Sequence, residues 1–113
     1  MDKVVEYRKK FIEVLRRHKG IISRASIRSS DSYFVFDESN DCYTWLRFGW
    51  SNKERKEFIT VFIHIREGKI WIEEDMTEQG IATELVELGV PKEDIVLAFH
   101  PPEMRQYTEF AAT

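Results

Sequence analysis

The stretch IHIREGKIWI, residues 63–72, decides the fold class, because two alternating apolar segments flank a single turn signal. Glycine adopts positive φ without steric cost, so Glu67-Gly68 fits the two-residue turn of a β-hairpin. Such a turn fixes which residues face one another across the strands. The predicted pairs are Ile65 with Ile70, Ile63 with Ile72, His64 with Trp71, and Phe62 with Glu73. The stretch therefore predicts two adjacent antiparallel strands.

The same alternation of period two extends upstream of this hairpin, to about residue 21. β-Branched and aromatic residues dominate this part of the chain, as is typical of strands. Strands are predicted near residues 22–28, 32–38, 42–50, 57–66 and 69–74. The connections between them are short and rich in Ser, Asn and Asp, which favour turns. They therefore predict a five-stranded antiparallel meander.

Helical periodicity is found on both sides of this strand-rich region. Residues 2–18 place seven apolar side chains on one arc of a helix, with Asp2 as the predicted N-cap and Gly20 as its end. A second helix is predicted over residues 77–89, beginning at Thr77 and ending at Gly89. This interpretation leaves Gly80 inside the helix, where glycine is unfavourable.

The end of the chain adds a short apolar run and a tail. Residues 95–99 are too few for a stable helix and predict a last strand. The tail, residues 105–113, carries enough apolar side chains to dock on the body.

The composition sets the class of protein. The chain has 113 residues, of which 42% are hydrophobic and 33% charged. This length supports one core, and this balance is typical of soluble globular proteins. We therefore predict an α+β fold in a single domain, residues 1–113. It comprises an N-terminal helix, a five-stranded and mainly antiparallel meander sheet, a second helix, a short C-terminal strand and a docked tail. No segment resembles a signal peptide or a spanning helix, so a cytoplasmic location is expected.

Charge is unevenly distributed around a net value of −3. Residues 1–28 contain nine Lys and Arg against three Asp and Glu, whereas the remainder contains eight against 17. A basic helix of this kind is either a DNA contact or a solvated helix face, and the second interpretation is more common for such blocks. The candidate DNA contacts are Arg8, Lys9, Lys10, Arg16, Arg17 and Lys19.

Two helices cover only one face of a five-stranded sheet. We expect the helices to pack on the face that carries Ile59, Val61, Ile63, Ile65, Ile70 and Ile72. Aromatic side chains remain on the opposite face, and a large exposed apolar surface usually marks an interface. We therefore predict that this face binds a second copy or another protein. In the alternative, residues 100–113 cover it within the chain. The candidate interface residues are Phe58, Phe62, His64, Trp71, Arg105 and Tyr107.

No pattern predicts a catalytic, cofactor or metal site. The three histidines are scattered and Cys42 stands alone, so no zinc-binding spacing occurs. There is no nucleophile elbow and no glycine-rich phosphate loop. Glu67-Gly68-Lys69 downstream of Asp37 and Asp41 faintly matches the acidic pattern of metal-dependent nucleases. The turn interpretation of Glu67-Gly68 is favoured over it.

Several spaced motifs in residues 68–110 point to a family. They are GKIWI at 68–72, Thr77, IA-x-EL at 81–85, GVPKEDIVL at 89–97, Pro102, and R-x-YT-x-F at 105–110. Together with the Met-Asp-Lys start and Gly49-Trp50, they resemble the XisI-like family, the fdxN element excision controlling factors. The resemblance implies a small cyanobacterial regulatory protein without catalytic residues. It also implies action beside a recombinase and an XisH-like partner, and we expect a homodimer.

Overall fold

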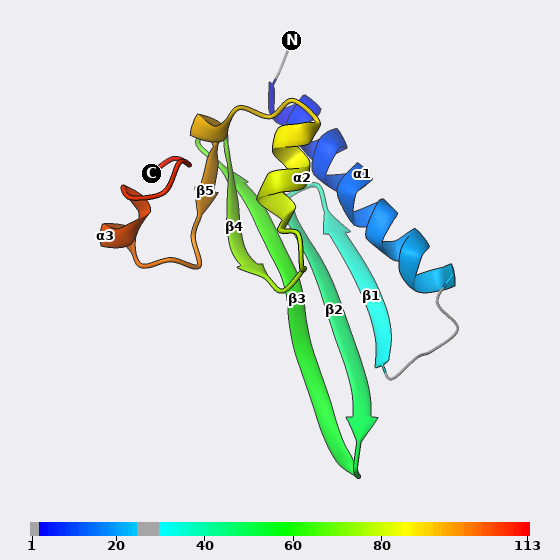
Figure 1. Ribbon diagram of the computed structural model, residues 1–113. Coiled ribbons are helices and arrows are strands. Elements are labelled where there is room, and N and C mark those ends of the chain that lie inside the picture. Colours follow the sequence, from blue (N-terminus) through cyan, green and yellow to red (C-terminus); the bar gives the residue numbers. More distant parts are fainter. Residues whose placement is uncertain (1–2, 25–29) are drawn as a thin grey trace.

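The computed structural model describes residues 3–24 and 30–113, which form a five-stranded sheet with two helices on one face (Figure 1). The elements are α1 (Lys3–Arg24), β1 (Ser30–Asp37), β2 (Cys42–Ser51), β3 (Glu54–Arg66), β4 (Lys69–Asp75), α2 (Ile81–Glu87), the 3-10 turn η1 (Lys92–Asp94), β5 (Ile95–Leu97) and α3 (Pro102–Arg105). The predicted α+β class is confirmed. No described helix has the length and apolar character needed to cross a membrane.

The sheet has the strand order β1-β2-β3-β4-β5. The first four strands form an antiparallel meander, and β5 adds parallel to β4 after the α2 crossover. The predicted strand at 22–28 is wrong where it is described, because residues 22–24 belong to α1; its residues 25–28 lie outside the described residues. Helix α1 continues past Gly20, since one glycine costs a helix only about 1 kcal/mol. The fifth strand is therefore β5.

The β3–β4 hairpin forms with the predicted turn. Glu67 and Gly68 both have positive φ, 53° and 75°, as a two-residue hairpin turn requires. Three predicted pairs are confirmed, from Ile65–Ile70 to Ile63–Ile72. The fourth is wrong: Phe62 pairs with Glu74, because a bulge inserts one extra residue into β4.

A second bulge divides β3 into two parts. Trp45 pairs with Val61 but Leu46 pairs with Ile59, so Thr60 is the extra residue. Its buried hydroxyl accepts a hydrogen bond from Arg47 Nε at 2.9 Å. An extra residue reverses the alternation of a strand. Ile59 therefore leaves the helix-covered face, where it was predicted to lie, and is half-exposed.

Helix α2 begins at Ile81, later than predicted, because residues 75–80 form a loop that caps its first turn. Asp75 Oδ2 accepts from the Ile81 amide at 2.6 Å, and the Thr77 hydroxyl accepts from the Gly80 amide at 3.2 Å. Gly80 therefore precedes the helix, with a φ of 94° that favours glycine. Gly89 ends the helix as predicted, with a φ of 100°.

The core lies between the sheet and α1 and α2. The centre of the apolar arc of α1 is buried, with Phe11 against Tyr43 at a ring-centroid separation of 4.4 Å, whereas Val4, Val5 and Ile12 are only partly buried. The tail docks beyond β5, where the Ala111 amide donates to the Ile95 carbonyl at 2.9 Å. The side of the sheet opposite both helices is thus left to solvent, apart from what the tail covers.

Candidate functional site

The outer sheet face is the side of the sheet opposite α1 and α2. Cross-strand partners lie on the same face, so the register assigns its members. They are Tyr33, Val35, Leu46, Phe48, Ile59, Phe62, His64 and Trp71. Most are apolar, although α1 and α2 both lie on the other side of the sheet. An antiparallel sheet with one solvated face normally carries polar residues there.

The tail covers this face only near β4 and β5. Arg105 extends over the Trp71 ring with its guanidinium carbon 5.7 Å from the centroid, and Arg66 lies above the same ring at 4.1 Å. Arg105 is held in place because it donates to the carbonyls of Ala98 and His100, both at 3.0 Å. Trp71 is consequently only 7% exposed. The predicted covering of the face by residues 100–113 is thus found at this end of the sheet.

The other end of the outer sheet face remains open. Tyr33 is 52% exposed and Val35 is 51% exposed. The rings of Tyr33 and Phe48 meet edge to face at 6.0 Å, and the Arg55 guanidinium lies 5.4 Å from the centre of Phe48. These side chains border an open groove of about 370 Å³. The groove combines aromatic rings with one arginine, a composition enriched at protein interfaces.

The structure brings four of the predicted interface residues together, of which Arg105 lies over the Trp71 ring. Phe62, His64 and Trp71 are neighbours on the outer sheet face, with ring separations of 5.9 and 6.1 Å, and His64 bonds to Glu73 at 2.7 Å. Phe58 lies on the opposite face because of the bulge at Thr60, beside Arg47.

Tyr107 extends into solvent on the tail. Tyr33 and Val35 were not among the predicted interface residues. Phe34 and Phe36 alternate with them, and apolar residues at every position of a strand do not indicate which face is buried.

The basic side chains of α1 are divided among several environments. Arg8 donates from Nε and Nη2 to Asp41 Oδ1 at 3.0 and 2.7 Å, which raises the pKa of its guanidinium. Lys10 lies beside Gly89, at the C-terminal end of α2, where the helix dipole favours a cation. Arg17 pairs with Glu13 at 3.6 Å. Arg8 is therefore held by a contact within the protein, whereas Arg17 stays exposed beside Glu13.

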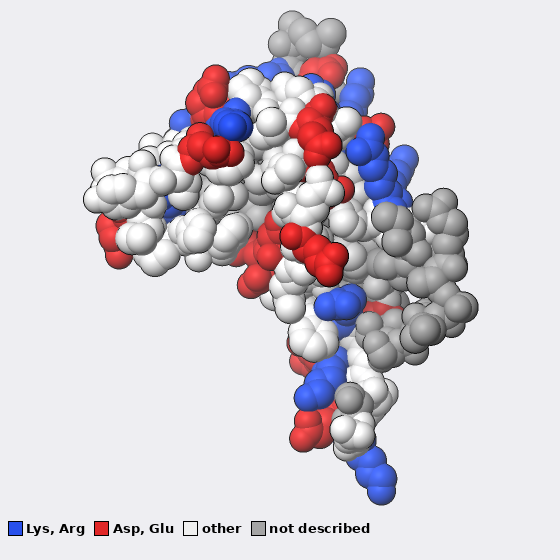
Figure 2. Space-filling model, in the orientation of Figure 1, with Lys and Arg blue, Asp and Glu red and all other residues white. Residues whose placement is uncertain are grey.

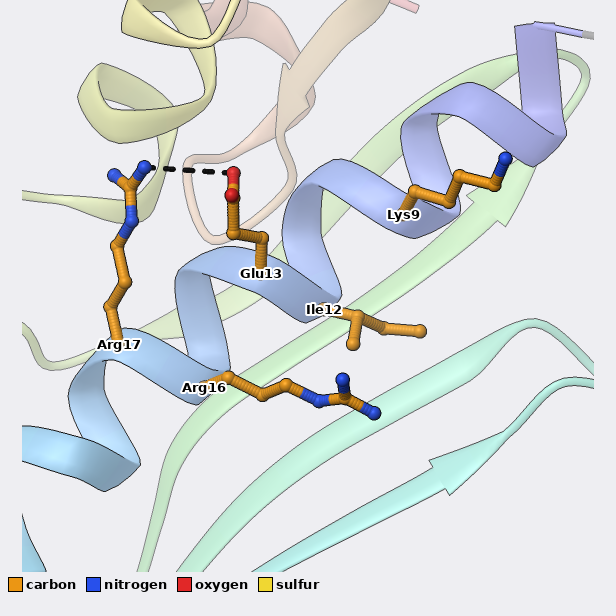
Figure 3. Close-up of a pocket in the computed structure, with 5 residues that line it drawn as sticks. All are labelled: Lys9, Ile12, Glu13, Arg16 and Arg17. Atoms are coloured by element: carbon orange, nitrogen blue, oxygen red, sulfur yellow. Dashed lines mark ion pairs between the residues drawn. The ribbon is translucent and has the colours of Figure 1, made fainter.

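Lys9, Arg16, Arg17 and Lys19 are the exposed members of that set. Figure 3 shows Lys9, Ile12 and Arg16 projecting to one side of α1, away from the Arg17–Glu13 pair, along an open groove of about 660 Å³. Figure 2 shows blue side chains gathered along α1 and red ones over neighbouring elements. The basic surface is thus narrower than the sequence predicted.

The acids of the nuclease-like pattern have separate contacts. Asp37 accepts from the Asn40 side chain at 2.8 Å, which lowers the pKa of its carboxyl group, and Asp41 pairs with Arg8. Glu67 lies in the hairpin turn, and Lys69 donates to the Thr113 carbonyl. Across residues 3–24 and 30–113, no three His, Cys, Asp or Glu side chains form a group that could hold a metal ion.

A family model and two solved structures are similar to this chain. The family model described as XisI protein matches residues 1–112. A crystal structure of the fdxN element excision controlling factor XisI from Anabaena variabilis is 38% identical, with a TM-score of 0.86, and the match covers 99% of this chain and 100% of that one. A crystal structure of a XisI-like protein from the same organism is 30% identical, with a TM-score of 0.85, covering 96% and 98%. No curated protein sequence matches the chain.

Proposed function

Because this chain belongs to the XisI family, we propose that it is a non-enzymatic accessory protein of programmed DNA element excision, and that it acts by binding another protein. One structural neighbour bears the name of an excision controlling factor, which is a regulatory role. The partner is an XisH-like protein, acting together with a recombinase. Arg105 and Trp71 form the end of the binding surface that the tail covers.

The observation that carries this proposal is the open end of the outer sheet face. Exposed Tyr33 and Val35 adjoin half-buried Phe48 and the Arg55 guanidinium, so an apolar centre is bordered by charge. Burial of apolar area stabilises a complex by about 25 cal/mol per Å², before the costs of association. Asp31 lies beside Arg55 in the same groove, and this mixed border suits a protein better than a nucleic acid.

Co-purification with a tagged XisH-like protein tests this surface. The double variant Tyr33→Ser/Val35→Ser removes the exposed apolar centre without opening the core, so we expect the affinity to fall by about tenfold or more. Met76→Ser is the matched control, because Met76 is 51% exposed but follows β4, which β2 and β3 separate from β1. Tyr107→Ala reports whether the tail takes part. Equal recovery of partner with the double variant and the control would exclude this face.

Direct DNA binding by α1 is the second candidate function, and one observation favours it. Lys9 and Arg16 point to the same side of the helix with Lys19 one turn further on, so three exposed cations follow one line. The acidic Glu13 stands next to this line and weakens the potential.

A filter-binding series in salt tests the DNA interpretation. If α1 contacts phosphates, Lys9→Glu/Arg16→Glu should abolish most retention and reduce the slope of log affinity against log salt by about 2. Lys92→Glu, a single charge reversal on η1, should leave the slope nearly intact. Absence of retention of the unmodified protein at low salt would end this interpretation.

A further inference from the structure

The sheet has an arm, residues 50–59, that extends beyond its neighbours (Figure 1). Strand β4 pairs only with Val61–Arg66 of β3, and the Met76 amide donates to the Thr60 carbonyl at 2.8 Å. From Glu54 to Ile59, β3 pairs with β2 on one side and with no described strand on the other. On its other side β2 is flanked by β1 as far as Gly49, so only residues 50–55 form a two-stranded ribbon. The edge of β3 from Glu54 to Ile59 pairs with no described strand and is free.

The free edge of β3 is open to a further strand. Such an edge presents a row of backbone donors and acceptors, and the two strands beyond Gly49 are only marginally stable by themselves. Trp50, Phe58 and Ile59 are all exposed on this arm. A third strand at the free edge would satisfy the backbone groups and bury part of this apolar surface.

The charges along the edge identify the strand that fits. Arg55 and Glu57 lie on the outer sheet face, since they pair with Trp50 and Phe48 of β2. They have opposite charge and are two residues apart, so the strand is complementary to a reversed copy of itself. Charged side chains on an edge, lysine above all, usually discourage pairing. Here the alternation favours one particular partner.

We propose that this edge pairs antiparallel with the same edge of a second copy of the chain, about a twofold axis at Lys56. Arg55 then faces Glu57 of the partner subunit, and the symmetry makes this ion pair twice. Lys56 meets its counterpart on the opposite face, where Glu54 Oε2 lies 2.9 Å from its Nζ and offsets its charge. Arg55 lies over Phe48 and Trp50 at 5.4 Å, which holds its guanidinium on that side of the strand.

The pairing joins two sheets edge to edge and leaves Tyr33 and Val35 uncovered. Figure 2 shows blue and red side chains alternating on the arm, at the bottom of the view. This surface shares Arg55 with the one proposed to bind another protein, whereas Tyr33 and Val35 belong only to the latter. The double variant Tyr33→Ser/Val35→Ser should therefore lose the other protein but keep the dimer, so failure of one proposal is distinguishable from failure of the other.

Gel filtration with light scattering on the purified full chain tests the dimer. The unmodified protein should elute at twice the 13.5 kDa of one chain and dissociate on dilution. Arg55→Glu turns both ion pairs into repulsions and should weaken association by about tenfold or more. The swap Arg55→Glu/Glu57→Arg restores opposite charges across the axis and should restore the dimer.

Glu67→Arg is the control, an equally exposed charge change in the β3–β4 turn, and it should leave the mass unchanged. A monomer at every concentration of the unmodified protein would overturn the proposal. So would a dimer that persists equally in Arg55→Glu, or a monomer that the charge swap does not rescue while circular dichroism shows native folding.

Discussion

Phe11→Ala should lower the free energy of unfolding by about 3–5 kcal/mol, the largest effect expected of any single truncation in α1. Phe11 has no exposed surface and packs its ring edge-on against Tyr43 at 4.4 Å. Removing it loses apolar burial and leaves a cavity at the contact between α1 and β2. Domains of this size are stable by only about 5–15 kcal/mol, so the variant is expected to be marginally folded. Urea unfolding followed by circular dichroism measures the loss.

Ile12→Ala is the matched control for this prediction. Ile12 is the next residue of the same helix, but it is only partly buried and borders the open groove of α1. Its truncation should cost about 1 kcal/mol, because much of the side chain is already in water. Equal losses for the two variants would show that α1 is not anchored through Phe11.

The β3–β4 turn and the C-terminal end of α2 illustrate what the sequence determines locally. Glu67-Gly68 and Gly89 occupy conformations with positive φ, which few residues other than glycine adopt readily, so short-range chemistry was sufficient to predict them. The C-terminal end of α1 was mispredicted for the opposite reason. Gly20 is helical, and the period-two pattern of residues 22–28 did not determine the structure of residues 22–24, where the helix continues.

The composition of the outer sheet face could be predicted only in part. Phe62, His64 and Trp71 follow from the hairpin register, which the turn fixes. The separation of Phe58 from Phe62 depends on the bulge at Thr60, whose buried hydroxyl is satisfied by Arg47 across the strand pair. A bulge stabilised by a tertiary hydrogen bond leaves no local pattern to detect. In β3, every residue before the bulge therefore lies on the opposite face from the one that simple alternation predicts.

The different environments of the basic side chains on α1 could not be predicted from the sequence. Arg8 and Arg16 have the same charge and lie on one helix, yet Arg8 is bound to Asp41 in the β1–β2 turn while Arg16 is exposed. Sequence separation of 33 residues between Arg8 and Asp41 gives no indication of this pair. A count of basic residues in the sequence therefore overestimates the surface available to DNA, because it does not show which side chains are paired within the folded protein.

Stability should fall steeply between pH 10 and pH 12, because two buried tyrosines resist ionisation in the folded protein. Burial, together with the hydrogen bond that its hydroxyl donates to Asp94, raises the pKa of Tyr7 from 10.0 to about 12. Burial raises the pKa of Tyr43 to about 12 as well, against the opposing positive charge of Arg8. Each pKa unit corresponds to about 1.4 kcal/mol, so each tyrosine contributes about 2–3 kcal/mol of pH-dependent stability.

The sign follows from which state loses its protons first. An unfolded tyrosine ionises near pH 10, whereas the folded one keeps its proton until about pH 12. The contribution is therefore complete below pH 10 and is lost as the pH rises through 12. Urea unfolding at intervals across this range, with tyrosinate absorbance recorded in parallel, measures both the loss and its cause.

Tyr43→Phe separates this effect from general alkaline damage. The variant loses the 3.3 Å hydrogen bond to Asp41 and the contact of the hydroxyl with Arg8, at a cost of about 1 kcal/mol below pH 10, and keeps the ring against Phe11. Above pH 10 its stability should decline about half as much as that of the unmodified protein. Since Tyr7→Phe should remove the other half, the double variant isolates the remaining pH dependence. A loss that is unchanged in both single variants would place the alkaline transition elsewhere in the chain.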